Sequence, residues 1–137
     1  MAANTKPIFP LTPKSFGITF VNADGTSYKD VFTAGSNGAI LDLLNIASTD
    51  TSARDIFLAI SDGVTTYEFG IIRVAITAGT DGVTPAANGL DIAFIKSLGN
   101  REDRSIVLQS GWKLRARPTV AVTAAKTVTI TGSYGDY

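Results

Sequence analysis

The chain has 137 residues, of which 45% are hydrophobic and 18% charged, a composition typical of one folded domain and not of a disordered chain. Twelve basic and twelve acidic residues cancel to a net charge of zero, so no overall field attracts nucleic acid or an anionic membrane. No apolar run reaches membrane-spanning length and the start at Met1 lacks a signal-peptide pattern, which predicts a soluble, unsecreted protein with protein partners.

Residues 1–13 carry three of the five prolines beside the large apolar side chains of Ile8, Phe9 and Leu11. Proline disfavours both helix and central strand, so this segment is predicted to be an extended arm. Two interpretations stay open: the arm folds back over its own core, or it docks on a neighbouring protein. The remaining residues, 14–137, are expected to form the folded domain.

Two hairpins are predicted in the first half of that domain. Residues 14–20 alternate between apolar and small side chains, 22–25 supply Asn, Asp and Gly for a turn, and 28–33 fit a returning strand. Residues 56–60 and 67–76 repeat this arrangement around a Ser-Asp-Gly turn.

Three segments have weaker patterns. Apolar residues in 39–48 are too dense for clean alternation, so a short helix and a strand buried on both faces both fit, and we favour the strand. Glycine, proline and asparagine in 78–89 predict a surface loop. Residues 90–98 fit either a helical turn or a strand.

The last third of the chain alternates most clearly. A short strand is expected at 106–108, followed by a strand at 112–117 in which Trp112, Leu114 and Ala116 point inward. Valine and isoleucine alternate with threonine in 127–131. Seven or eight short strands without a convincing helix predict an all-β fold, an antiparallel β-sandwich or jelly roll in a single domain.

The sequence offers little for catalysis. It has no histidine and no cysteine, which removes the commonest general base, the thiol nucleophile and the usual zinc ligands. A glycosidase needs only two carboxylates, for which Glu68, Glu102 and Asp103 are the candidates. All three are better explained as solvated surface charge, so the protein is expected not to be an enzyme.

No cofactor, metal or small-molecule substrate is expected. Phosphate-binding glycine motifs are absent. Asp-Gly pairs at 24–25, 62–63 and 81–82 lack the further oxygen ligands of a calcium loop and are predicted to be simple turns.

Lys113, Arg115 and Arg117 form a basic stripe on one strand face. Phosphate binding is one interpretation of the stripe, but in a neutral chain we prefer the other, in which the charges protect an edge strand from aggregation. Trp112, the sole tryptophan, is interpreted as a core residue rather than a sugar-stacking platform.

Three segments carry a resemblance to a known class of proteins. The opening ANTKPIFPLTPK at 3–14, SGWKLRA at 110–116 and the closing YGDY at 134–137 resemble small virion proteins of tailed phages. The resemblance covers the chain loosely, through its ends and turns and not through one continuous motif.

The resemblance implies a capsid decoration (cement) protein on the outside of the phage head. Such a protein is β-rich, often a homo-trimer, and binds the major capsid protein; it would be made in the host cytoplasm. Its expected contact residues are Ile8, Phe9 and Leu11 in the arm and Tyr134 and Tyr137 at the C-terminal end. A tail or baseplate component and a carbohydrate-binding module that reads a host receptor remain the alternatives.

Overall fold

A computed structural model describes residues 10–91 and 106–137. These residues contain nine strands and one short 3₁₀ helix. The strands are β1 (Thr12–Phe20), β2 (Lys29–Thr33), β3 (Ala39–Ser48), β4 (Arg54–Ser61), β5 (Thr66–Val74), β6 (Ala87–Asn88), β7 (Ile106–Leu108), β8 (Lys113–Pro118) and β9 (Val128–Asp136).

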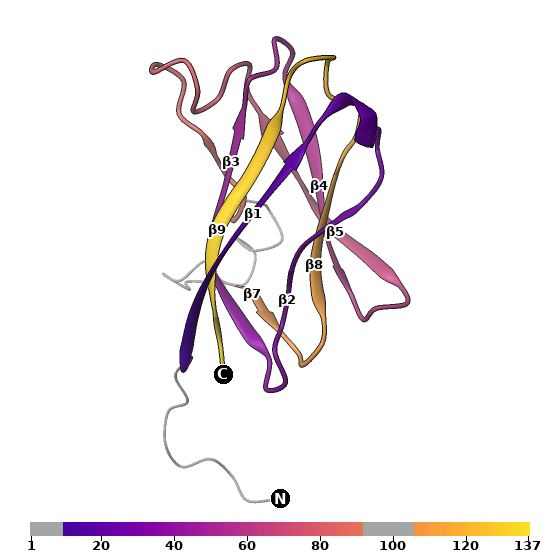
Figure 1. The fold of residues 1–137 in the computed structure, drawn as a ribbon, viewed down its shortest axis with the longest axis vertical. Helices are drawn as coiled ribbons and strands as arrows, with labels where there is room; N and C mark the ends of the chain where they lie inside the picture. Colours follow the sequence, from indigo (N-terminus) through magenta and orange to yellow (C-terminus); the bar gives the residue numbers. More distant parts are fainter. Residues whose placement is uncertain (1–9, 92–105) are drawn as a thin grey trace, which may run out of the picture.

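The strands form two antiparallel sheets that pack face to face (Figure 1). Sheet A has the order β1-β9-β3, with β6 and β7 both pairing with β3. Sheet B has the order β2-β8-β4-β5. The predicted all-β, antiparallel sandwich is therefore confirmed. Among the residues that the structure describes, no helix has the length and apolar character needed to cross a membrane.

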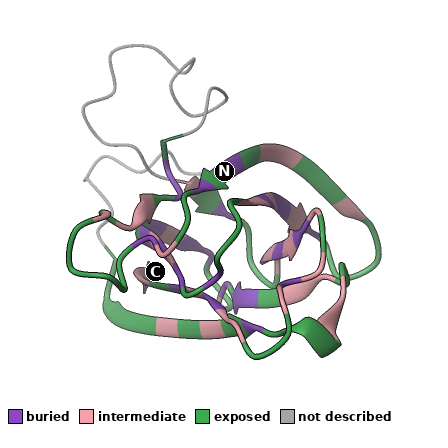
Figure 2. Cartoon of the chain, turned by 90° about the horizontal axis from the view of Figure 1, so that it is seen from above, coloured by how far each residue is buried: buried purple, intermediate pink, exposed green. Residues whose placement is uncertain are grey.

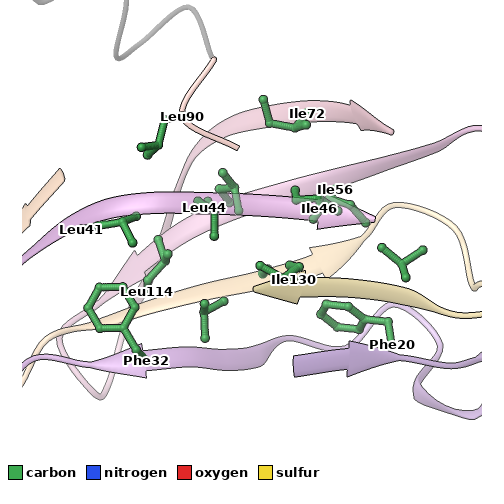
Figure 3. Close-up of a cluster of buried hydrophobic side chains, with 14 of the residues drawn as sticks. Phe20, Phe32, Leu41, Leu44, Ile46, Ile56, Ile72, Leu90, Leu114 and Ile130 are labelled. Carbon is green, nitrogen blue, oxygen red and sulfur yellow. The ribbon is translucent and has the colours of Figure 1, made fainter. Parts of the chain in front are cut away.

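The core lies between the sheets and follows the alternation of the strands. Side chains from both inner faces interdigitate, as Figure 3 shows for Leu44, Leu114 and Ile130. All three have no exposed surface, and Trp112 packs against this core while half-buried. Figure 2 shows the buried positions alternating along the strands of both layers, which is the geometry that period-two patterns produce.

The first predicted hairpin is wrong. β1 pairs with β9, and β2 pairs with β8 in the other sheet. The turn at Asn22–Asp24, a 3₁₀ helix closed by Gly25, carries the chain from one sheet to the other. Alternation determines which side chains face the core, but it is equally satisfied whichever strand supplies the backbone hydrogen bonds.

The second predicted hairpin and the central strand are confirmed. β4 and β5 pair along their length with one irregularity at Leu58/Ala59. Residues 39–48 form the favoured strand, β3, which is hydrogen-bonded along both edges within sheet A. It is not buried on both faces, because Asp42 and Leu43 are exposed. The loop predicted at 78–89 includes the two-residue strand β6, and of 90–98 only Leu90 and Asp91 lie within the described residues.

The interpretation of 112–117 as an edge strand is wrong. β8 lies inside sheet B, paired with β2 on one side and β4 on the other. Strand position within a sheet depends on pairing between distant segments, which a single-strand pattern does not encode.

Candidate interaction surface

One end of the sandwich, at the bottom of Figure 1, brings the two ends of the described chain together. The start of β1, the turn between β2 and β3, strand β7 and the C-terminus all lie there. An open pocket of about 580 Å³ is lined by Leu11, Asn37, Val107 and Tyr137.

Strand pairing explains why these residues meet. Ile40 of β3 lies opposite Gly135 on one side and Val107 on the other. Pro10 packs directly over Gly135: a Cβ added to this glycine would lie only 2.5 Å from the Pro10 ring. The absence of a side chain at Gly135 thus allows the segment entering β1 to lie across β9.

The resulting surface is apolar. We call Pro10, Leu11, Ile40, Val107 and Tyr137 the terminal apolar surface. Within this surface, Leu11 is 82% exposed and Val107 is 61% exposed. Clustered exposed apolar residues of this kind are typical of contact surfaces.

An ion pair between a half-exposed lysine and a buried aspartate supports this surface from below. Lys14 Nζ lies 2.7 Å from Asp136 Oδ2, and the Gly35 backbone N–H donates to Asp136 Oδ1 at 3.0 Å. The Lys14 hydrogen bond, together with that of Gly35, lowers the pKa of Asp136 and keeps it ionised. Asp136 therefore joins β1, β9 and the turn between β2 and β3.

The predicted contact residues divide into three groups. Leu11 and Tyr137 are brought together at the pocket. Tyr134 belongs to the core-facing side of β9, where its ring stacks on Phe32 with centroids 4.2 Å apart. Ile8 and Phe9 lie outside the described residues.

Val107 and Ile40 are surface residues that sequence reasoning missed. A signal for Val107 was present, since Ile106 and Leu108 alternate inward and leave Val107 on the outer face. Its proximity to Leu11 was not visible, because it depends on β7 pairing with β3.

The basic stripe on β8 is paired within the chain. Lys113 Nζ and Arg115 Nε each lie 2.8 Å from a carboxylate oxygen of Asp30. Arg117 Nη2 lies 3.0 Å from Glu68. These pairs use the cations that a phosphate group would need, so the outer face of sheet B is a poor anion site.

Glu68 lacks the environment of a catalytic acid. It accepts hydrogen bonds from the Tyr28 hydroxyl and from Arg117, and these lower its pKa. A general acid requires the opposite shift. The other two carboxylates considered, Glu102 and Asp103, lie outside the described residues.

The aspartates of the Asp-Gly pairs act in turns, as predicted. Asp62 accepts backbone N–H groups of Val64 and Thr65, and Asp81 accepts those of Val83 and Thr84. Within residues 10–91 and 106–137, no group of three His, Cys, Asp or Glu side chains is placed to hold a metal ion.

At the opposite end of the sandwich, Asp50 is fully buried and joins the β3–β4 loop to the β8–β9 loop. It accepts hydrogen bonds from Arg54 Nε at 2.7 Å, from the Ser52 N–H at 2.9 Å, and from both the N–H and the hydroxyl of Thr123 at 3.0 and 2.8 Å. Burial opposes ionisation, but these hydrogen bonds outweigh it and hold the pKa of Asp50 well below its usual range.

Comparison with known proteins reveals similarity of fold. No family model and no curated protein matches the chain. A chain from the acidic stable capsid structure of Helicobacter pylori bacteriophage KHP30 superimposes with a TM-score of 0.58 at 11% identity, covering 93% of this chain and 90% of that one. A chain from the cyanophage Pam1 capsid asymmetric unit gives 0.45 at 15% identity, covering 100% and 94%. This protein therefore shares the fold of the KHP30 capsid chain over nearly its whole length.

Proposed function

We propose that this protein is a non-enzymatic structural component of a phage particle, a decoration protein that binds the outer surface of the head. The observation that carries the proposal is the combination of a sandwich shared with a phage capsid chain and an exposed apolar surface at one end. The resemblance of the terminal segments to virion proteins supports the same role.

The terminal apolar surface is the proposed contact with the major capsid protein. Burying large apolar side chains supplies the favourable free energy, at about 25 cal/mol per Å² removed from water. Leu11 and Val107 contribute most because they are the most exposed apolar side chains at this end of sheet A. Tyr137 adds aromatic area and a hydroxyl donor at the same place.

The arm and Tyr134 remain part of the proposal in different ways. Ile8 and Phe9 precede Pro10, which enters the surface, so an extended arm would carry them from this end of the sandwich to a neighbouring subunit. Tyr134 acts indirectly, by stacking on Phe32 and stabilising β9 beneath the surface. The threefold association and the location on the head rather than the tail stay predictions from the resemblance.

Binding to purified heads tests the contact. Heads lacking the protein are titrated with the wild-type protein and with the variant Leu11→Ser/Val107→Ser. Each truncated apolar contact costs about 1–2 kcal/mol, so the affinity should fall by about tenfold or more. Val83→Ser is the matched control, because Val83 is 86% exposed in a loop at the opposite end.

Two outcomes would contradict the proposal. Wild-type protein that does not bind heads removes the decoration role, and a double variant that binds as tightly as the wild type removes the terminal apolar surface. Deletion of residues 2–9, which leaves β1 intact, tests the arm separately. Antibody labelling of intact virions distinguishes a head from a tail location.

A further inference from the structure

Among the described residues, strand β1 has one hydrogen-bonding edge that no other strand uses. It lies at the margin of sheet A, where β9 is its partner, and no strand among the described residues pairs with its other side (Figure 1). An open strand edge is a template for a further strand, and natural proteins usually cover or protect it. Which backbone groups are open follows from the pairing of β9.

The open groups belong to Ser15, Gly17 and Thr19. The Thr49 N–H donates to the Thr127 carbonyl, so Thr127 and every second residue after it bond toward β3. The alternate residues of β9, beginning with Val128, therefore bond toward β1. Their partners in β1 are Phe20 and every second residue before it. The remaining residues of β1 therefore direct their N–H and C=O groups away from the sheet.

An independent contact agrees with this assignment. The carbonyl of Thr19 accepts a hydrogen bond from Lys29 Nζ at 2.7 Å, and Lys29 belongs to the other sheet. The hydroxyls of Thr19 and Thr129 lie 3.3 Å apart, as expected of a pair that is not joined by backbone hydrogen bonds, in which side chains lie closer.

The row of free backbone groups ends at Pro13 on one side and at Val21 on the other. Pro13 has no N–H to offer, and proline is tolerated where the missing N–H would face away from the sheet. At the other end the Val21 N–H is already bonded to Asp24 Oδ2 at 2.8 Å. Gly17 lies midway between Pro13 and Val21, so the row is symmetric about this glycine.

We propose that β1 pairs antiparallel with β1 of a second copy of this chain, about a twofold axis at Gly17. In this register Gly17 faces its own equivalent, and Ser15 faces Thr19 of the second copy. The three pairs make about six hydrogen bonds between the chains. The Thr19 carbonyl takes part because its oxygen has a second lone pair beside the one that Lys29 uses.

The side chains of β1 also favour a second copy as the occupant. Phe16 and Ile18 lie on the inner side of β1 and are only partly buried against the core. The proposed register places Phe16 opposite Ile18 of the second copy and Ile18 opposite its Phe16. The apolar edges of the two cores then cover one another. The small outer-side residues Ser15, Gly17 and Thr19 leave room for a neighbouring strand.

This pairing gives a dimer and is independent of any role on a phage. A C2 contact uses the same surface on both chains, whereas a closed threefold ring needs two different surfaces. Threefold association, if it occurs on a capsid, would use another part of the molecule. The mass of the protein in solution and the cysteine crosslinks that report the β1–β1 register therefore test the inference without phage heads.

Single cysteines provide a sharp test, because the chain contains none. Gly17→Cys places two sulfurs on residues whose Cα atoms lie about 5.5 Å apart in the proposed pair, within disulfide range. The variant should form a disulfide-linked dimer under mild oxidation. Ser15→Cys alone should not, because its equivalent lies four positions away, about 13 Å, but mixed with Thr19→Cys it should give a crosslinked heterodimer.

Sedimentation of uncrosslinked protein gives the second measurement. The wild type should have the mass of a dimer, Gly17→Pro that of a monomer, and Gly17→Thr that of a dimer. A Cβ at Gly17 meets only Thr131 Cγ2 at 3.7 Å, so threonine fits the sheet and retains the N–H.

A wild-type monomer or trimer would overturn the inference. So would Ser15→Cys crosslinking as efficiently as Gly17→Cys, or a dimer that persists in folded Gly17→Pro. If Gly17→Pro fails to fold by circular dichroism, the cysteine register decides alone.

Discussion

The two ends of the sandwich are stabilised in different ways. At the end that holds Asp50, a fully buried carboxylate joins the β3–β4 and β8–β9 loops through hydrogen bonds from Arg54, Ser52 and Thr123. At the other end Asp136 has a similar role on a smaller scale, and the surface above it is apolar and exposed.

The difference separates stability from contact. The Asp50 carboxylate finds its hydrogen-bond donors within the chain, so its contribution is to folding and not to contact with a partner. The terminal apolar surface gains free energy only when something covers it. We therefore expect substitutions at the first end to change folding and substitutions at the second to change association.

The largest effect is expected from Asp50→Ala. Removing one member of a buried ion pair leaves Arg54 and the Thr123 N–H without their acceptor, at a cost of about 3–5 kcal/mol in the free energy of unfolding. Urea denaturation measures this. The matched control is Asp55→Ala, because Asp55 pairs with an Arg73 side chain that is 72% exposed and should change stability little. Equal losses in both variants would refute the contrast.

Acid should weaken both ends, and the Asp50 end more strongly. The pKa values of Asp50 and Asp136 are lowered in the folded protein from an ordinary value of 3.8, so their stabilisation is complete above that pH and is lost as the pH falls below it. Lys14, the partner of Asp136, is 46% exposed, so solvent screens the attraction between Lys14 and Asp136. The free energy of unfolding of the wild type should fall as the pH is lowered, and Asp50→Asn should remove more of this pH dependence than Asp136→Asn. The reverse order would contradict the burial argument.

A smaller loss is expected from Gly38→Ala, beneath the terminal apolar surface. Gly38 has φ of +89°, and an added Cβ would lie 2.7 Å from the Leu108 carbonyl oxygen. Strain and overlap together should cost about 1–3 kcal/mol. Gly63→Ala is the control, since its φ of +98° is similar and no atom lies within 4 Å of the added Cβ. If both variants lose the same stability, only the backbone conformation matters.

The smallest change in stability is expected from Leu11→Ser/Val107→Ser. Both side chains are largely exposed, so the free energy of unfolding should stay within about 0.5 kcal/mol of the wild type. Denaturation of the same preparation used for head binding checks this. A large loss of stability would show that these residues belong to the core and would remove the distinction between the two ends.

Much of the fold was accessible from local patterns. The β4–β5 hairpin follows from two alternating runs around a short turn, and 39–48 is a strand as favoured, although its outer face exposes Leu43. The β1–β2 hairpin failed although its pattern looked equally good, because the turn at Asn22–Asp24 changes sheet.

The contact surface was accessible only in part. Leu11 and Tyr137 were expected at interfaces because they are apolar or aromatic residues near the chain ends, and the pocket brings them together. Val107 and Ile40 join them through strand pairings between segments far apart in sequence. No local signal reports such pairings.

The sequence by itself determined the all-β class, most strand positions and the inward-facing residues, because side-chain alternation is a local property of an extended backbone. Only the tertiary structure decided which strands pair, that β8 is internal, and that the cations on it are neutralised by Asp30 and Glu68. It also decided that β1 has an edge with no partner among the described residues. Backbone hydrogen bonds are chemically alike at nearly every residue, so the choice among partners depends on how the whole core packs.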